Sequence, residues 1–249
     1  SYFDKTQDYP ADHPEQNYFV TVQNVGVTKD HDGKIVLVTE DIRNGNGRTV
    51  KSRYSTPNRV DKFEEPINAV YWIMKDDALP PLVKVDEAVL AATFGTTLAT
   101  KRTTAETLKK GESTDTLVIE PFANPFRVYP LVEDYAGFKE LLAHEDVDCY
   151  IINTGFFMGK KIPKEVSLGV IESVVEGTAS FVPFGAAPHL SYLPVEGFNP
   201  DFEDKDYTEL VRRRMQLRED FLEAFNAAHP SMPLPDESIQ ALQNIIDAF

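Results

Sequence analysis

The sequence contains a single cysteine, Cys149, among 249 residues, which excludes an internal disulfide. Cys149 lies in an apolar run, so we expect a buried, unreactive thiol and a reducing compartment. No apolar stretch approaches the roughly 20 residues that a membrane helix requires. The run at 147–152, for example, is short and is interrupted by Asp148. We therefore expect a cytoplasmic protein without a membrane span.

Basic residues are also scarce, because 25 lysines and arginines stand against 40 aspartates and glutamates, leaving a net charge of -15. A nucleic-acid binder needs a basic stripe to neutralise phosphates, so no nucleic-acid partner is expected. The acidic residues are scattered along the chain, which is typical of a solubilising surface. A small anionic ligand remains possible wherever basic residues gather locally.

Self-sufficient catalytic motifs are absent as well. The sequence has no Walker-type phosphate-binding loop, no zinc-binding cysteine set and no nucleophile elbow. The histidines at 31, 144, 189 and 229 are far apart and lack the spacing of metal ligands. Their default interpretation is therefore a surface or structural role.

The chain is 42% hydrophobic, which is enough for a sizeable folded core. Valine- and threonine-rich segments at 18–27 and 34–39 flank a turn at His31–Lys34 and predict a hairpin. Short apolar runs predict buried strands at 69–74 and 147–152. Helical periodicity predicts helices at about 86–97, 135–143, 163–175, 207–226 and 236–248. The proline-rich segment 181–199 is expected to be largely irregular.

These elements do not alternate regularly, so they predict an α/β or α+β fold with a mixed sheet and flanking helices. The length allows one large domain or two small ones, and we treat 1–249 as one domain. Within it, 1–17 is expected to be an extended connector and 227–249 a C-terminal extension that carries a helix. Residues 101–116 are expected to form a loop, because the apolar period stops at Leu98 and Gly111 interrupts the polar segment beyond it.

One local pattern suggests ligand binding. The predicted strand ends at Asn153-Thr154-Gly155, and the turn Gly159-Lys160-Lys161-Ile162 then leads into a helix whose first turns include Ser167. A glycine-containing strand-to-helix loop with two lysines can present N–H groups and positive charge to an anion. A solvated loop with lysines at its tip would have the same sequence, so the pattern alone leaves both interpretations open.

Several segments occur in the same order as in the ATP-dependent phosphoenolpyruvate carboxykinases, and the chain resembles that family from Tyr2 to about Phe225. The resembling segments are Tyr2–Thr6, Pro57–Arg59, Ala78–Lys84, Ile119–Phe122, Asn153–Gly155, Gly159–Ile162 and Gly177–Pro200. The resemblance implies the C-terminal part of that fold, with the adenine side and the lid side of a nucleotide site. The family's phosphate-binding loop, metal ligands and substrate-binding domain precede this part, so the chain alone is expected to be inactive.

The resemblance also implies individual roles. Lys161, Ile162 and Ser167 would contact adenine and ribose, Lys5 would lie near the phosphates, and Arg59 would bridge the γ-phosphate and the substrate. A forked guanidinium suits that bridge because it holds phosphate oxygens and neutralises their charge. From spacing alone, a surface arginine in a Pro-Asn turn is the favoured interpretation of Arg59. Lys5 is equally a solvated terminal lysine.

Two positions depart from the family pattern. The family has arginine where Lys161 stands, and lysine lacks the planar stacking face of a guanidinium. It has threonine where Ser167 stands, and serine keeps the hydroxyl. The family's acidic nucleotide contact aligns with His13 or with Glu15, depending on a gap, and is assigned to neither.

The implied function is conversion of oxaloacetate and ATP to phosphoenolpyruvate, carbon dioxide and ADP, a reaction of gluconeogenesis. ATP and a divalent metal, Mg or Mn, would serve the complete protein, with the metal ligands outside this chain. Residues 101–120 take the place of the family's lid, although its threonine-rich motif is not recognisable. The alternative is a non-catalytic or altered-substrate nucleotide-binding relative, which Lys161 and the lid sequence favour. A third interpretation is an unrelated α/β domain.

Overall fold

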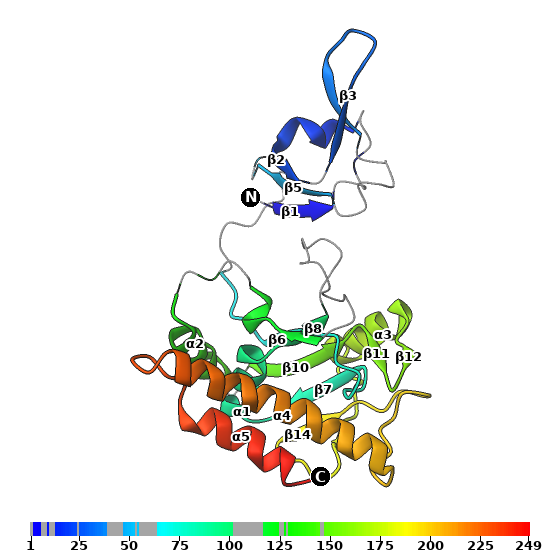
Figure 1. Cartoon of the computed structure of the whole chain (residues 1–249). Coiled ribbons are helices and arrows are strands. Elements are labelled where there is room, and N and C mark those ends of the chain that lie inside the picture. The colour runs from blue at the N-terminus through cyan, green and yellow to red at the C-terminus, as the bar shows by residue number, and fades with distance from the viewer. Residues whose placement is uncertain are drawn as a thin grey trace. The chain divides into compact units, whose positions relative to one another are not determined.

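A computed structural model describes residues 2–5, 9, 13–23, 25–38, 47–52, 54, 64–101, 117–124, 127, 129–144 and 147–249. The chain divides into two compact units (Figure 1). The first is formed by Ser1–Pro66 with Arg102–Thr114, and the second by Ile67–Lys101 with Asp115–Phe249.

The first unit contains a three-stranded antiparallel sheet and a separate hairpin. The sheet has the order β1-β5-β2, with β1 at Tyr2–Lys5, β5 at Arg48–Lys51 and β2 at Phe19–Gln23. The hairpin pairs β3 (Gly26–Lys29) with β4 (Ile35–Val38), which confirms the hairpin predicted around His31–Lys34.

Two details of this unit differ from the simplest sequence expectation. The segment predicted as one strand at 18–27 is divided between β2 and β3. The segment 1–17, expected as a connector, contains β1 and most of a short 3-10 helix, Pro14–Tyr18.

The second unit is built on a five-stranded mixed sheet with the order β13-β14-β7-β10-β6. Strand β10 (Asp148–Asn153) runs parallel to β6 (Ala69–Met74) and antiparallel to β7 (Leu82–Val85). Strands β14 (Leu190–Tyr192) and β13 (Val182–Pro183) extend the sheet beyond β7. The mixed sheet and both strands predicted in it are therefore confirmed, with β10 shifted by one residue.

The sequence pattern does not predict β7, because it is short and follows Pro80 and Pro81 directly. The segment 181–199 is largely irregular, as expected, and its regular parts are the short strands β13 and β14. Pro183 is accommodated because β13 is the edge strand, where a missing N–H group need not break a ladder.

Five α-helices flank this sheet in the described part of the chain (Figure 1). Four of them pack on the sheet face that carries Val83 and Ile151. The fifth covers the opposite face, where Leu82, Tyr150 and Ile152 meet Val170. Alternate residues of β10 thus reach different cores, as side chains of a strand must. The first four are α1 (Ala88–Thr96), α2 (Leu131–Leu142), α4 (Lys205–Ala228) and α5 (Asp236–Ile246), and the fifth is α3 (Lys164–Val175).

These helices confirm the predicted ones, with differences at their ends. The largest difference is in α2, which begins at Leu131 rather than Tyr135 because Pro130 occupies the N-cap position. Helix α1 begins after Glu87, whose carboxylate accepts the N–H groups of Val89 and Leu90 at 2.8 and 2.7 Å. This N-cap satisfies donors that have no intrahelical partner.

Two short pairs of strands complete the second unit. Strand β8 (Ala99–Lys101) pairs with β9 (Leu117–Ile119), and β11 (Phe156–Phe157) pairs with β12 (Lys160–Lys161). The predicted loop at 101–116 joins β8 to β9. Apart from Lys101, it lies outside the described residues.

A buried ion pair joins α4 to the loop between β6 and β7. Asp76 and Arg218 are both 0% exposed, and Arg218 Nη2 donates to Asp76 Oδ2 at 2.7 Å. The other carboxylate oxygen accepts the N–H of Ala78 at 3.1 Å and lies 3.4 Å from Arg214 Nε. Burial of both charges is tolerated because each is neutralised and hydrogen-bonded.

We expect Asp76→Asn to lower the free energy of unfolding by about 3–5 kcal/mol, because it leaves the Arg218 charge buried without a counter-charge. Urea unfolding followed by circular dichroism measures this loss. The double variant Asp76→Asn/Arg218→Met should recover at least half of it, since no buried charge remains. A loss below about 1 kcal/mol in the single variant would contradict the assigned role of the pair.

Candidate functional site

The turn singled out in the sequence lies where β10 ends, and a buried amide organises it. Asn153 is 0% exposed, and the two hydrogens of its Nδ2 are shared among three carbonyl oxygens, those of Asp76 (2.7 Å), Leu79 (2.6 Å) and Phe156 (2.9 Å). Its Oδ1 accepts the N–H of Gly155 at 2.9 Å. One side chain therefore holds together the end of β10, the β6–β7 loop and the start of the next hairpin.

That hairpin, β11–β12, has a defined turn geometry. Met158 and Gly159 both have positive φ, 46° and 76°, as in a type I′ turn. The pairing sets Phe156 opposite Lys161, and Met158 N–H donates to the carbonyl of Asp77 at 3.0 Å. Gly155 allows close backbone approach, because a Cβ there would lie 3.2 Å from Lys75 Cα. The hairpin is thus a rigid platform.

Three lysines lie on or beside this platform, and two of them place their ammonium groups near the ring of Phe156. Lys161 Nζ donates to the carbonyl of Thr154 at 3.1 Å and lies 5.2 Å from the ring centroid of Phe156. Lys101, at the end of β8, places its Nζ 5.8 Å from the same ring centroid. Lys160 Nζ donates to the carbonyl of Gly197 at 3.1 Å. A fourth lysine, Lys75, has its backbone against Gly155.

Lys101, Lys160 and Lys161 are called the lysine cluster below. The neighbouring acids already have arginine partners, because Asp76 pairs with Arg218 and Asp77 lies 2.6 Å from Arg214. Within the described residues, neither Lys160 nor Lys161 forms an ion pair with a carboxylate. The hairpin is therefore a locally positive surface on a chain of net charge -15.

The other predicted site residues have different environments. Ile162 is 2% exposed and packs in the core, and its N–H donates to the carbonyl of Gly155 at 3.0 Å. Ser167 lies half-buried in the first turns of α3, with Oγ 3.5 Å from the carbonyl of Pro163. Lys161, Ile162 and Ser167 lie in one continuous segment, from β12 into the first turns of α3. Lys5 lies in β1 of the other unit, and Arg59 lies outside the described residues.

Sequence reasoning missed Phe156, Lys101 and the bonding of Asn153. Phe156 is 42% exposed, and its position directly after Thr154-Gly155 is the one local sequence feature that points to it. No local feature identifies Lys101, because its proximity to Phe156 depends on how distant segments of the chain pack.

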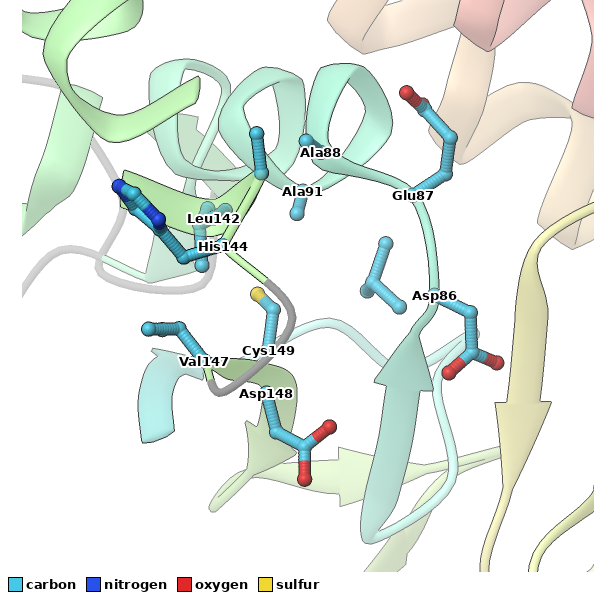
Figure 2. Close-up of a pocket in the computed structure, with 11 residues that line it drawn as sticks. Asp86, Glu87, Ala88, Ala91, Leu142, His144, Val147, Asp148 and Cys149 are labelled. Atoms are coloured by element: carbon cyan, nitrogen blue, oxygen red, sulfur yellow. The ribbon is translucent and has the colours of Figure 1, made fainter. Parts of the chain in front are cut away.

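The opposite end of β10 borders a separate cavity of about 350 Å³ (Figure 2). Asp86 and Glu87 line it before α1, His144 after α2, and Asp148 and Cys149 at the start of β10. Cys149 is 2% exposed, and burial raises the pKa of its thiol to about 12. The buried thiol predicted from sequence is thus confirmed.

We expect the Cys149 thiol of the native chain to react with an aromatic disulfide reagent at pH 8 two to three orders of magnitude more slowly than in urea. Only the thiolate attacks, and a pKa near 12 leaves little thiolate at pH 8. The native rate should rise with pH up to about 12. Equal rates in native and unfolded chains would contradict the burial of this residue.

Neither a metal centre nor a membrane helix is formed by the part of the chain that the structure describes. Among the described residues, no group of three or more His, Cys, Asp or Glu side chains is placed to hold a metal ion. No described helix is long and apolar enough to cross a membrane.

With this geometry in place, the chain can be described as a mixed-sheet α+β protein with a lysine-bearing hairpin at one strand end. It is similar to the phosphoenolpyruvate carboxykinase (ATP) of Aeropyrum pernix, with 23% identity over 161 residues. The match covers 62% of this chain and 32% of that protein, so it spans about a third of the relative's length. No family model matches the chain. The similarity indicates a distant relationship to phosphoenolpyruvate carboxykinases.

Proposed function

We propose that this chain is the nucleotide-site segment of an ATP-dependent phosphoenolpyruvate carboxykinase and that it binds ATP at the β11–β12 hairpin. The observation that carries the proposal is the lysine cluster, a positive surface on an acidic chain, at the turn that resembles the family's adenine-binding segment. A cytoplasmic role in gluconeogenesis belongs to the same proposal. The distant similarity to the Aeropyrum pernix enzyme supports it.

The geometry of the hairpin suits an anionic ligand. The ammonium group of Lys161 is anchored 3.1 Å from the carbonyl of Thr154, so it is held in place before a ligand arrives. Helix α3 begins directly after the hairpin, and no side chain caps its first N–H groups. A helix N-terminus attracts negative charge through these groups, and the nearby lysines add to the effect.

In the complete protein, this segment would hold ATP for transfer of its γ-phosphate to the enolate that oxaloacetate yields on losing carbon dioxide. Arg59 would hold the γ-phosphate, since a guanidinium forms two parallel bonds to phosphate oxygens. A bound Mg or Mn ion would neutralise phosphate charge. In the hairpin segment, Lys161 and Ser167 would contact the nucleotide on its adenine and ribose side, with Lys161 bonding to oxygen atoms. Lys5 would add charge near the phosphates.

A second candidate function is nucleotide binding without carboxykinase chemistry. Lysine at position 161 keeps the charge of an arginine and loses its planar face, which weakens the argument for the family's adenine contact. The core position of Ile162 further limits what its side chain offers to a ligand. Both observations favour a relative that retained the fold while its ligand contacts changed.

We expect Lys161→Ala to weaken ATP binding to the chain roughly 10- to 100-fold, the usual effect of losing a hydrogen bond to a charged group. Ser167→Ala should weaken it less than about tenfold, as for one neutral hydrogen bond. Titration calorimetry measures both. The matched control is Lys139→Ala, which removes a half-exposed lysine of α2 that pairs with Glu237 of α5. Wild-type affinity in Lys161→Ala would contradict the hairpin site.

In the complete protein, Arg59→Ala should chiefly lower turnover, whereas Lys161→Ala should chiefly raise the KM for ATP. The reason is that Arg59 would act on charge that develops during phosphoryl transfer, and Lys161 on the bound nucleotide. Steady-state kinetics separates the two effects. An unchanged kcat in Arg59→Ala would remove Arg59 from the proposed site.

The purified 249-residue chain should not convert oxaloacetate and ATP to phosphoenolpyruvate, because its sequence contains no phosphate-binding loop. A coupled assay for phosphoenolpyruvate tests this expectation. Measurable turnover by this chain would show that it carries catalytic parts that we assign elsewhere.

A further inference from the structure

Phe156 is a large aromatic side chain that the core does not use. The residue is 42% exposed and belongs to neither apolar cluster of the described part of the chain. Exposed single apolar residues are common, so exposure alone means little. The position of this residue is nevertheless tightly fixed.

Three features hold Phe156 in place. Its carbonyl accepts Asn153 Nδ2 at 2.9 Å, it follows the close backbone approach at Gly155, and it pairs with Lys161 across the hairpin. The adjacent residue Phe157 is 5% exposed and anchors the strand in the core. An aromatic ring on such a rigid strand loses little further conformational freedom when a ligand stacks on it.

The surroundings of the ring are electrostatically unusual. The ammonium groups of Lys161 and Lys101 lie 5.2 and 5.8 Å from its centroid, within the range of a cation–π interaction. Two positive charges thus converge on one ring in a chain of net charge -15. A ligand that offers a flat π surface together with negative charge matches both features.

We propose that Phe156 is the base-stacking residue of the nucleotide site and that the site takes a purine nucleotide; the inference rests on the proposed function. Lys161 has no planar face on which a base can stack, whereas Phe156 presents one beside it. Stacking on an aromatic side chain contributes roughly tenfold in affinity per base. The lysines then bind the phosphate and ribose oxygens, and the ring binds the base.

The test compares adenosine, ATP and inorganic tripolyphosphate as ligands of the full chain. Phe156→Leu should weaken the binding of adenosine and of ATP roughly tenfold, because stacking acts only on the base. The affinity for tripolyphosphate should stay within about twofold of wild type. Phe156→Trp should bind adenosine and ATP at least as tightly as wild type. The matched control is Leu168→Ala, which truncates a side chain that is 64% exposed on α3 and should change no affinity.

Phe156→Trp also provides a direct spectroscopic readout. Trp72, the one tryptophan of the chain, is 6% exposed, so a tryptophan at position 156 would be the solvent-exposed fluorophore. Adenosine should quench its fluorescence, and tripolyphosphate should not. Unchanged melting temperatures in both variants would show that any loss of affinity is local.

The possible outcomes separate the two proposals. If wild type binds ATP and Phe156→Leu binds adenosine equally well, the stacking role is overturned and nucleotide binding stands. If Phe156→Leu weakens the binding of tripolyphosphate as much as that of ATP, the ring acts only by positioning the lysines, and the stacking role is also overturned. If wild type binds tripolyphosphate as tightly as ATP and does not bind adenosine, the nucleotide function itself fails.

Discussion

The buried pair of Asp76 and Arg218 is the constraint on which the rest of the second unit depends. Two charges at 0% exposure are tolerated only if every oxygen of the carboxylate is engaged, and Asp76 meets this condition with Arg218, Arg214 and the N–H of Ala78. The carbonyl of Asp76 then accepts Asn153 Nδ2. Asp76 therefore contacts both α4 and the end of β10, and these contacts fix the helix, the β6–β7 loop and the strand in one arrangement.

The hydrogen bonds of Asp76 and Asn153 also hold the β11–β12 hairpin in place. Asn153 bonds to both Gly155 and Phe156, and the turn between β11 and β12 uses two residues of positive φ. A surface turn with lysines at its tip would ordinarily sample many conformations. Here the backbone is fixed from the core side, so the positions of Phe156 and Lys161 are set before any ligand binds. Preorganisation of this kind raises affinity by reducing the entropy lost on binding.

The sequence predicts those parts of the fold in which local pattern and burial agree. Strand β6 coincides with the predicted 69–74, and the amphipathic helices α4 and α5 follow their apolar period. Strand β7 is invisible to the same criteria, because its role depends on pairing with β10 and β14, segments more than sixty residues away. The same distinction applies to the site residues. Lys161 lies in a turn that the sequence predicts, whereas the contact of Lys101 with Phe156 forms only after the strands have assembled.

Arginines and lysines near the hairpin have different partners, and this difference explains how an acidic chain presents a positive surface. Arg214 and Arg218 lie inward and neutralise Asp77 and Asp76 with directed hydrogen bonds, a task that suits a planar guanidinium. The carboxylates near the hairpin are thereby satisfied by α4 and do not draw in the neighbouring lysines. Lys160 and Lys161 instead bond to backbone carbonyls, which hold an ammonium group without cancelling its charge. The net charge of -15 therefore says little about this site, since its local sign depends on which residues the fold has already paired.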